Sequence, residues 1–467
     1  MSAAPLRLVT APVADRPPLD TFGVREAARV LMIGLVLGGT LLAGLARHGI
    51  RKALRRSGSG WREAAAEATV DAFERLGPLF VKLGQLIASS SGAFPPALST
   101  ACLRCLDRVR PFPAAAARQI VRADLARPVD ELFRSFDDTP LSAASVAQVH
   151  ACVLPDGREA VLKIQRPGIA RRMIVDLRAA LRTARLLEQF SHAARVANAV
   201  GVVDDLYEAT VGELNFLVEA ENQRRIRADL TAFGDNEGVM VPEVHTAYCG
   251  PRVLCMERVR GVPLDRFDVT AAHPDPELLI RRLVKVWLEG VTVHGLFHGD
   301  VHAGNLWLLD DGRLAMLDFG IVGRMTAPWR QLVRNMFHAS AFDGDFTPVA
   351  ASLRELDLFP DQSSDDAAIG SQLAMVLGPI LSGELAELDL KTVTGLMLDF
   401  GTDSGMSGPR QLILMGKQLG YFERYAVTLA PDWRLGTDLF LLRNIFPDEV
   451  AAARAELPAA DRSERSG

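Results

Sequence analysis

FHGDVHAGNLWLLDDGRLAMLDFGIVG, residues 297–323, is the stretch of the chain that decides the predicted fold. Two apolar runs, Leu306–Leu309 and Leu314–Leu317, flank the turn residues Asp310-Asp311-Gly312, which predicts a β-hairpin. A hairpin at this place brings the loop before it close in space to Asp318, which directly follows it. The segment therefore predicts a cluster of polar side chains at one end of a hairpin.

The residue types in this cluster are suited to magnesium bound to ATP. The amide of Asn305 and the carboxylate of Asp318 are the predicted metal ligands, because Mg²⁺ prefers hard oxygen donors. Asp300 is left to accept a proton from a hydroxyl nucleophile or to orient a water molecule. His302 is spaced to buttress the loop, and Gly320 permits the backbone turn after Asp318. The spacing resembles the catalytic loop and D-F-G of protein kinases and predicts a phosphotransferase site that uses ATP and Mg²⁺.

A kinase site also needs a lysine on a strand of the smaller lobe. The run Ala160-Val161-Leu162-Lys163 matches the position of V-A-I-K, so Lys163 is predicted to hold the α and β phosphates. Glu219, on a predicted helix, is the preferred partner of this lysine, and Glu213 is the alternative. The predicted catalytic residues are Asp300, Lys163, Asn305 and Glu219.

The loop before the predicted strands differs from that of ordinary kinases. Where G-x-G-x-x-G is expected, the chain has small residues whose backbone N–H groups can approach a phosphate: Ala143, Ala144, Ser145, Val146 and Ala147. Adenine is expected to lie against a hinge near Met256 and Val259, because Arg260-Gly261 leaves the sheet there.

These motifs predict an α+β, two-lobed, protein-kinase-like fold with an N-terminal helical extension and a largely helical C-lobe. The predicted organisation is a disordered N-terminus at 1–22, a hydrophobic and basic membrane-associating segment at 23–60, a helical extension at 61–135, the N-lobe at 136–260, the C-lobe at 261–447 and a flexible tail at 448–467.

The membrane-associating segment contains a run of 17 uncharged residues, Val30 to Ala46. This length lies at the lower limit for a transmembrane helix, and Gly34 and Gly38 form a G-x-x-x-G. A basic cluster follows: Arg47, Arg51, Lys52, Arg55 and Arg56. It predicts a location at the cytoplasmic face of a membrane, by a single N-terminal span or by a helix at the interface. A buried helix in a soluble protein is the remaining alternative.

Composition narrows the classes of partner. The 467 residues carry a formal net charge of -5, which gives no general reason to expect nucleic acid. The 5 cysteines have no disulfide-framework spacing, which indicates a reducing compartment. Cys102 and Cys105 form one C-x-x-C, which is either a metal or redox pair or simply two thiols one turn apart on a helix.

Several separate motifs together resemble the UbiB/AarF family of atypical kinases. They are LGPLFVKLGQL at 76–86 with the K-x-G-Q signature, AASVAQVH at 143–150, VLKIQRPGI at 161–169, and the FHGDVHAGN and LDFG loops. The resemblance covers about residues 75–325.

The resemblance implies that the K-x-G-Q segment packs across the nucleotide site, where Lys82 and Gln85 restrain it, and that the alanine-rich loop alters nucleotide preference. Members of this family hydrolyse ATP, sit at membranes and support isoprenoid quinone biosynthesis or lipid homeostasis. A membrane surface or a lipid or prenyl-quinone intermediate is therefore the expected partner besides ATP, and Glu213 joins Lys82 and Gln85 as a regulatory residue.

The chain departs from the family pattern in its regulatory part. The E-x-D motif appears as Glu213-Leu214-Asn215, and Asn215 cannot supply a carboxylate to pair with Lys82 or a metal. The arginine-proline-aspartate expected after K-x-G-Q is replaced by Ser89-Ser90-Ser91-Gly92. Gly299 stands where kinases have an arginine, and no A-P-E follows D-F-G, so control by phosphorylation of an activation loop is not expected.

Two other functions compete with the UbiB-like kinase or ATPase. The loop H-G-D-x-H-x-G-N also resembles that of aminoglycoside and choline phosphotransferases, which lack K-x-G-Q and the alanine-rich loop. The other alternative is a nucleotide-gated membrane scaffold with weak turnover. Retention of Asp300 favours an enzyme, because a protein that only binds ATP does not need this carboxylate.

Overall fold

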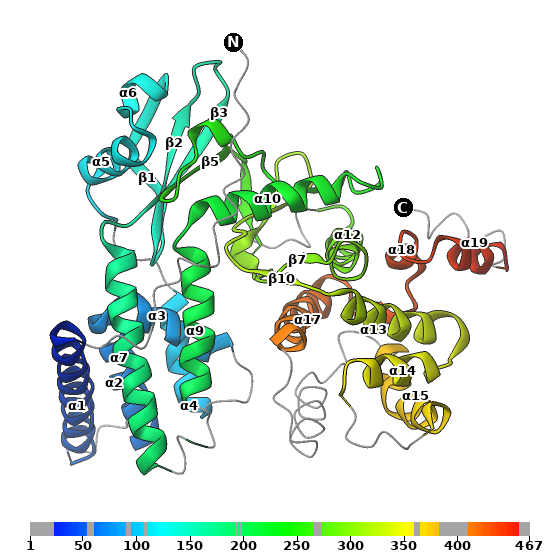
Figure 1. Cartoon of the computed structure of the whole chain (residues 1–467), viewed down its shortest axis with the longest axis horizontal. Helices are drawn as coiled ribbons and strands as arrows, with labels where there is room; N and C mark the ends of the chain where they lie inside the picture. The colour runs from blue at the N-terminus through cyan, green and yellow to red at the C-terminus, as the bar shows by residue number, and fades with distance from the viewer. Residues whose placement is uncertain are drawn as a thin grey trace. The chain divides into compact units, whose positions relative to one another are not determined.

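The computed structural model describes residues 23–53, 60–89, 95–106, 111–191, 195, 199–264, 273–358, 365–382 and 410–456. The chain forms two compact units: unit 1 is Met1–Ala220 with Val244–Arg258, and unit 2 is Glu221–Glu243 with Val259–Gly467 (Figure 1). The stretch 1–22, for which the sequence predicts disorder, lies outside the described residues. Helix α10, Phe216–Leu230, carries the chain from unit 1 into unit 2.

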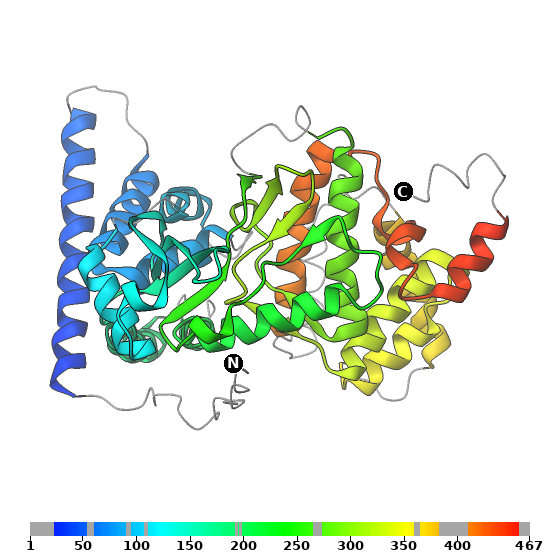
Figure 2. The ribbon, with the colours of Figure 1, turned by 90° about the horizontal axis from the view of Figure 1, so that it is seen from above.

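Helices make up the larger part of unit 1 (Figures 1 and 2). They are α1 (Val24–Ala53), α2 (Trp61–Leu76), α3 (Pro78–Ser89), α4 (Pro96–Cys102), the short η2 (Leu103–Leu106), α7 (Ile169–Phe190) and α9 (Ala199–Glu213). Their shared core contains Phe73, Leu79, Met173 and Leu177. Apolar residues at helical spacing in each sequence produce these buried stripes.

The other part of unit 1 is a four-stranded antiparallel sheet in the order β1-β2-β3-β5. Its strands are β1 (Ser135–Ala143), β2 (Ala147–Val153), β3 (Glu159–Gln165) and β5 (Val253–Glu257). Two helices, α5 (Ala114–Leu125) and α6 (Val129–Leu132), share an apolar core with the sheet.

Strands β2 and β3 form a hairpin, and Gly157 in its turn has φ +91. The sequence analysis did not identify β1. This edge strand contains Pro140 and has no buried residue, so it lacks the apolar alternation that indicates a strand.

Unit 2 is mainly helical. Its helices are α12 (Pro276–Glu289), α13 (Ala327–His338), α14 (Thr347–Glu355), α15 (Asp366–Ser382), α17 (Arg410–Leu429), α18 (Leu439–Leu442) and α19 (Pro447–Glu456). One small sheet has the order β4-β9-β8-β6, with β4 (Val239–Met240), β6 (Gly261–Pro263), β8 (Leu306–Leu309) and β9 (Leu314–Met316). A second pairs β7 (Leu296–His298) with β10 (Val322–Arg324).

The chain end differs from the prediction. The sequence predicts a flexible tail from residue 448, but α19 continues to Glu456. Val450 is buried in the core of unit 2, and this burial fixes a helix whose own sequence is weakly amphipathic. Residues 457–467 lie outside the described part of the chain.

Candidate functional site

The hairpin predicted from 297–323 is present as β8 and β9, which pair antiparallel. Gly312 in its turn has φ +84, a conformation that favours glycine. After the hairpin, the N–H of Leu317 donates to the carbonyl of Asn305 at 2.8 Å. Asn305 is therefore held beside the backbone that leads directly into Asp318.

A second hydrogen bond joins Asn305 to Asp300. The side-chain Nδ2 of Asn305 donates to the carbonyl of Asp300 at 3.0 Å, which leaves the amide oxygen for a cation. Asp318 has φ +63, in the left-handed region that non-glycine residues rarely adopt. Its Oδ1 accepts from the N–H of Gly320 at 3.2 Å. The structure thus brings Asp300, Asn305 and Asp318 into one loop cluster within unit 2.

His298 is buried and holds this cluster in place through two hydrogen bonds. The sequence predicts this supporting role for His302 instead. The Nδ1 of His298 accepts from the N–H of Asp300 at 3.0 Å, and its Nε2 donates to the carbonyl of Leu317 at 3.0 Å. These partners require the neutral imidazole. Burial lowers the pKa of His298, which keeps the ring neutral at physiological pH.

His302 contacts residues of its own loop. Its Nδ1 accepts from the N–H of Gly304 at 3.1 Å and so caps the short turn Ala303–Asn305. Its Nε2 lies 3.6 Å from Oδ2 of Asp300, and its side chain is 42% exposed. It therefore faces the carboxylate and does not support the loop from the core.

Helix α17 supplies contacts to the catalytic loop that the sequence analysis missed. Nζ of Lys417 lies 2.7 Å from Oδ1 of Asp300. The fully buried Gln418 accepts from the N–H of Val301 at 2.9 Å and donates to the carbonyl of Gly299 at 2.7 Å. No local spacing could have revealed these partners, because they lie 117 and more residues away along the chain.

Close packing explains the glycine at position 299. A Cβ at this residue would lie 3.0 Å from Cγ2 of Ile321 and 3.2 Å from Cδ2 of Leu414. Because the neighbours are this close, a side chain at 299 would force them apart. Close packing therefore disfavours, in this chain, the arginine that ordinary kinases have at this position.

In unit 1, the predicted lysine pairs with the preferred glutamate. Nζ of Lys163 on β3 lies 2.7 and 2.9 Å from the two carboxylate oxygens of Glu219 on α10. The side chain of Glu219 is only 2% exposed, so the carboxylate holds the lysine from inside the unit. Glu213, the alternative partner, is engaged elsewhere.

Glu213 instead forms an ion pair with Lys82 of the K-x-G-Q segment. Gln85 donates to the carbonyl of Cys105 at 2.9 Å. Between them, Gly84 permits a close approach, since a Cβ there would lie 2.4 Å from Sγ of Cys105. The three regulatory candidates therefore tie α3 to α9 and to η2 within unit 1.

Asn215 takes a different part from the aspartate of the family motif. Its Oδ1 accepts from the N–H of Leu217 at 3.1 Å, and its carbonyl accepts from the N–H of Val218 at 3.0 Å. Asn215 thus caps the N-terminus of α10, the helix that bears Glu219, and asparagine is a favoured residue for this position. The charge of Lys82 is balanced by Glu213 without a carboxylate at 215.

The alanine-rich loop is the turn between β1 and β2. The N–H of Ala144 donates to the carbonyl of Ala147 at 2.8 Å, and Val146 is buried. Arg166 donates from its backbone N–H to Val146 and from Nε to Ala144, each at 2.8 Å. The N–H of Ala144 is therefore already used inside the turn, contrary to the expectation that it meets a phosphate.

The remaining predicted nucleotide contacts fall in both units. Ala143 ends β1, and Ser145 lies within the turn. Met256, on β5 in unit 1, is 9% exposed and pairs with Val161 on β3. Val259 belongs to unit 2, where it packs against Leu309 and other apolar residues.

His150 fixes the strand that follows this loop. Its Nε2 accepts from the side-chain amide of Gln148 at 2.7 Å, and its Nδ1 donates to the carbonyl of Asp137 at 2.8 Å. The bond that Nε2 accepts requires a neutral ring, and burial lowers the pKa of His150 below its ordinary value of about 6.5.

The neutral state of His150 predicts a pH-dependent stability. The unfolded chain gains a proton on His150 as the pH falls below about 6.5, whereas the folded chain resists it. The stabilisation is thus complete above this pH and is lost as the pH falls towards the lowered pKa. The unfolding temperature is expected to fall between pH 7.5 and 5.5 by thermal-shift measurement. The fall is expected to be smaller in His150→Asn; equal falls in the two proteins would contradict this role.

The C-x-x-C pair is buried inside unit 1. Cys102 ends α4, Cys105 lies in η2, and both thiols are free. Burial raises the pKa of Cys105 to about 11, which disfavours the thiolate that metals and redox partners require. Within the described ranges, no cluster of three or more His, Cys, Asp or Glu side chains is placed to hold a metal.

The predicted magnesium site has two protein ligands, Asn305 and Asp318. Mg²⁺ is usually held by one or two protein oxygens together with substrate phosphates and waters, not by an all-protein cage. The free amide oxygen of Asn305 and the carboxylate of Asp318 match that donor set.

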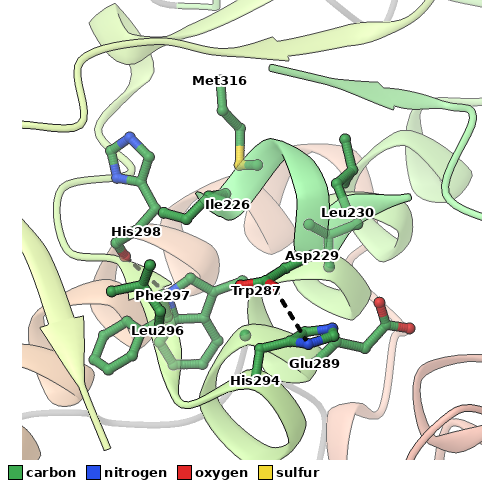
Figure 3. Close-up of a pocket in the computed structure, with 12 residues that line it drawn as sticks. Ile226, Asp229, Leu230, Trp287, Glu289, His294, Leu296, Phe297, His298 and Met316 are labelled. Carbon is green, nitrogen blue, oxygen red and sulfur yellow. Dashed lines mark hydrogen bonds and ion pairs between the residues drawn. The ribbon is translucent and has the colours of Figure 1, made fainter. Parts of the chain in front are cut away.

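A small cavity of about 20 Å³ is lined by residues that include His298, Trp287 and His294 (Figure 3). Nδ1 of His294 lies 3.7 Å from Asp229, and the indole of Trp287 donates to the carbonyl of His298 at 3.0 Å. The volume is sufficient for about one water molecule and far too small for a nucleotide. Trp287, which lines this cavity, holds the backbone of His298 in place.

The chain is similar to a known protein family and to individual known proteins. A family model described as the ABC1 atypical kinase-like domain matches residues 104–353. An uncharacterised protein of Mycobacterium tuberculosis is 34% identical over 425 residues, which cover 91% of this chain and 84% of that protein. A protein named "Probable protein kinase UbiB" from Aeromonas salmonicida is 33% identical over 366 residues, covering 77% of this chain and 66% of its own.

Two solved structures are also similar. One is a Mycobacterium tuberculosis protein in complex with erythromycin, with a TM-score of 0.48, 26% identity, and coverage of 80% of this chain and 99% of that one. The other is the Rio2 kinase of Chaetomium thermophilum, with a TM-score of 0.28, 15% identity, and coverage of 75% and 98%. The family model confirms the kinase-like fold predicted from the sequence.

Proposed function

Because the chain belongs to the ABC1, or UbiB/AarF, family of atypical kinase-like proteins, we propose that it binds ATP with Mg²⁺ and hydrolyses or transfers the terminal phosphate. The observation that carries the proposal is the cluster in which the carbonyl of Asp300 and the backbone of Leu317 both bond to Asn305. A kinase-like family indicates a phosphotransferase, and this cluster retains the residue types that the reaction needs.

Each residue has a proposed part. Magnesium, when bound, neutralises charge on the β and γ phosphates, and Asn305 and Asp318 would hold it. Asp300 accepts the proton of the nucleophile or orients a water molecule. Lys163, fixed by Glu219, binds the α and β phosphates. The N–H groups of Ser145 and Val146 are proposed to face phosphate, and Met256 and Val259 to flank adenine.

The acceptor is proposed to be associated with a membrane. Among the described residues, one helix, within Val24–Ile50, is long and apolar enough to cross a bilayer. Named relatives include UbiB proteins, and support of isoprenoid quinone or lipid metabolism is proposed on that basis. The ion pair of Lys82 with Glu213 is proposed to restrain the site, as the K-x-G-Q resemblance implies.

The decisive experiment measures ATP hydrolysis by the full chain with and without anionic liposomes. Asp318→Asn is expected to lower the rate by about 100-fold or more while the unfolding temperature is kept, because a metal ligand is weakened. Asp310→Asn, an exposed aspartate of the same hairpin, is the matched control and should retain the rate. A protein with no nucleotide-dependent thermal shift and no turnover in either condition would overturn the proposal.

A further inference from the structure

The exposed face of α1 is apolar over most of its length. Leu31, Leu35 and Leu42 are 65%, 67% and 73% exposed, and no charged residue lies between Val30 and Ala46. Only 17% of the apolar window of this helix is buried. Single exposed leucines are ordinary, but a continuous stripe of this kind marks an interaction surface.

The opposite face of α1 packs against other helices of unit 1 between Arg29 and Arg47. Near its start, Nε of Arg29 lies 2.5 Å from Asp176 of α7, in a pair whose side chains are 14% and 1% exposed. Ile33 is buried, and a Cβ at Gly44 would lie 2.6 Å from Cβ of Ala68 on α2. Near its end, Arg47 lies 3.7 Å from Asp71 of α2. These contacts hold the inner face of the helix between Arg29 and Arg47.

This packing is incompatible with a transmembrane position of α1. Its partner α2 carries Glu67, Asp71 and Glu74, all of which bond to Arg104. A bilayer around α1 would draw these charged side chains into hydrocarbon, where each costs several kcal/mol. While α1 stays packed on α2, only its outer face can meet lipid.

A basic groove adjoins that outer face. Its volume is about 580 Å³, and its lining includes Met32 of α1 together with arginines at the end of α2 and the start of α7. Asp176 forms an ion pair with Arg29 and attracts Arg172 at longer range. Among the described residues, no carboxylate lies within ion-pair distance of the three other guanidinium groups of the groove, Arg75, Arg171 and Arg172. Guanidinium groups bind phosphate oxygens in pairs, so the groove is suited to an anionic headgroup.

We propose that α1 lies flat on an anionic phospholipid membrane, with its outer face against acyl chains and a lipid phosphate in the groove of Arg75, Arg171 and Arg172. The inference rests on the membrane location proposed above and is independent of ATP turnover. The sequence places a further basic cluster, Arg51 to Arg56, directly after this face. These cations favour an anionic membrane over a second copy of the chain, which would bring equal charges together.

The orientation of α1 is tested by measuring how deeply its residues enter the bilayer. A single cysteine is introduced in turn at Leu31, Leu35, Leu42 and Leu45, labelled with an environment-sensitive fluorophore, and quenched by lipids with spin labels at shallow or deep acyl positions. The unsubstituted chain, whose described cysteines are buried or half-buried, is the labelling blank. A flat helix gives the same shallow depth, about 5–10 Å below the headgroups, at all four positions. A depth that increases towards the middle of α1 would show a span and overturn the proposal.

The chemistry of the surface is tested by co-sedimentation with vesicles of phosphatidylcholine alone or with phosphatidylglycerol. Arg171→Gln with Arg172→Gln is expected to reduce binding to the anionic vesicles at least tenfold; Arg122→Gln with Arg134→Gln, two exposed arginines elsewhere in unit 1, should not. Leu35→Glu with Leu42→Glu should reduce binding equally, and Met375→Glu, an exposed apolar residue of unit 2, should not.

The other possible results of these binding experiments also support or overturn the proposal. Thermal unfolding of each variant shows that the fold is kept, and if the double variants do not fold, Leu35→Glu and Arg171→Gln are measured singly. Loss of binding in the arginine variants alone would overturn the part assigned to α1. No vesicle binding, together with a dimer that the leucine variants dissociate, would assign the face to a second copy and overturn the proposal. Retained ATP turnover in that case would leave the catalytic proposal standing.

Discussion

Lys417→Met is expected to lower ATP turnover by about 10²–10³-fold while the affinity for ATP changes less than about threefold. Nζ of Lys417 lies 2.7 Å from the carboxylate of Asp300, and the lysine is 5.7 Å above the ring of Tyr421 on the same helix. We therefore propose that Lys417 orients Asp300 and brings a positive charge close to the transferred phosphoryl group, on which negative charge develops. An effect of this kind appears in kcat and not in the binding of the nucleotide.

The controls separate this role from a structural one. Lys417→Arg keeps the charge and should restore part of kcat, and Arg424→Met, an exposed cation of the same helix, should leave kcat unchanged. ATP affinity is measured by titration calorimetry, and unfolding temperature by thermal shift. If Lys417→Met loses kcat, ATP affinity and thermal stability together, the lysine only supports the fold.

Lys285→Met is expected to reduce the free energy of unfolding of unit 2 by about 3–5 kcal/mol. Lys285 is 1% exposed, and its ammonium group lies 2.7 Å from Glu289, 2.9 Å from Asp235 and 2.7 Å from the amide oxygen of Asn236. Asn444 of the loop after α18 donates to Glu289 at 2.7 Å. Removing the cation leaves Glu289, with a 2% exposed side chain, as a buried charge without its counter-charge.

A half-exposed cation with three carboxylate partners, one more than Lys285 has, provides the contrast. Arg104 bonds to Glu67, Asp71 and Glu74, but its side chain is 40% exposed, so Arg104→Met is expected to cost less than about 1 kcal/mol. Adding Glu289→Leu to Lys285→Met should recover part of the loss, because the uncompensated charge is removed. Urea unfolding measures all three. If Lys285→Met and Arg104→Met lower the free energy of unfolding equally, burial of the charge does not explain the predicted difference between them.

The candidate site was partly readable from the sequence because its main elements are local. Asp300, Asn305 and Asp318 lie in one segment, and the hairpin that gathers them is encoded by its own apolar runs and turn residues. The pairing of Lys163 with Glu219 follows from a motif position on a strand and a glutamate on a helix. The exclusion of Glu213 as its partner did not follow, since only packing places that side chain beside Lys82.

Other residues of the candidate site could not be identified from the residue types around them in the sequence. Lys417 and Gln418 are ordinary polar residues of an amphipathic helix until the fold brings α17 to the catalytic loop. The sequence predicts His302 as the support of the loop, whereas the burial and hydrogen bonds of His298 give that role to His298. In the same way, Asn215 reads as a lost carboxylate in the sequence but serves as a helix cap in the structure.

The sequence by itself determined the family, the kinase-like fold, the hairpin of residues 306–316 and the apolar character of α1, because each depends on residue types at short, regular spacing. Only the tertiary structure decided which side of α1 is packed, which helix reaches Asp300, and which carboxylates hold Lys82, Lys163 and Lys285. These contacts join residues far apart in the chain, and they are selected by the burial of charge and by close packing, which no local pattern encodes.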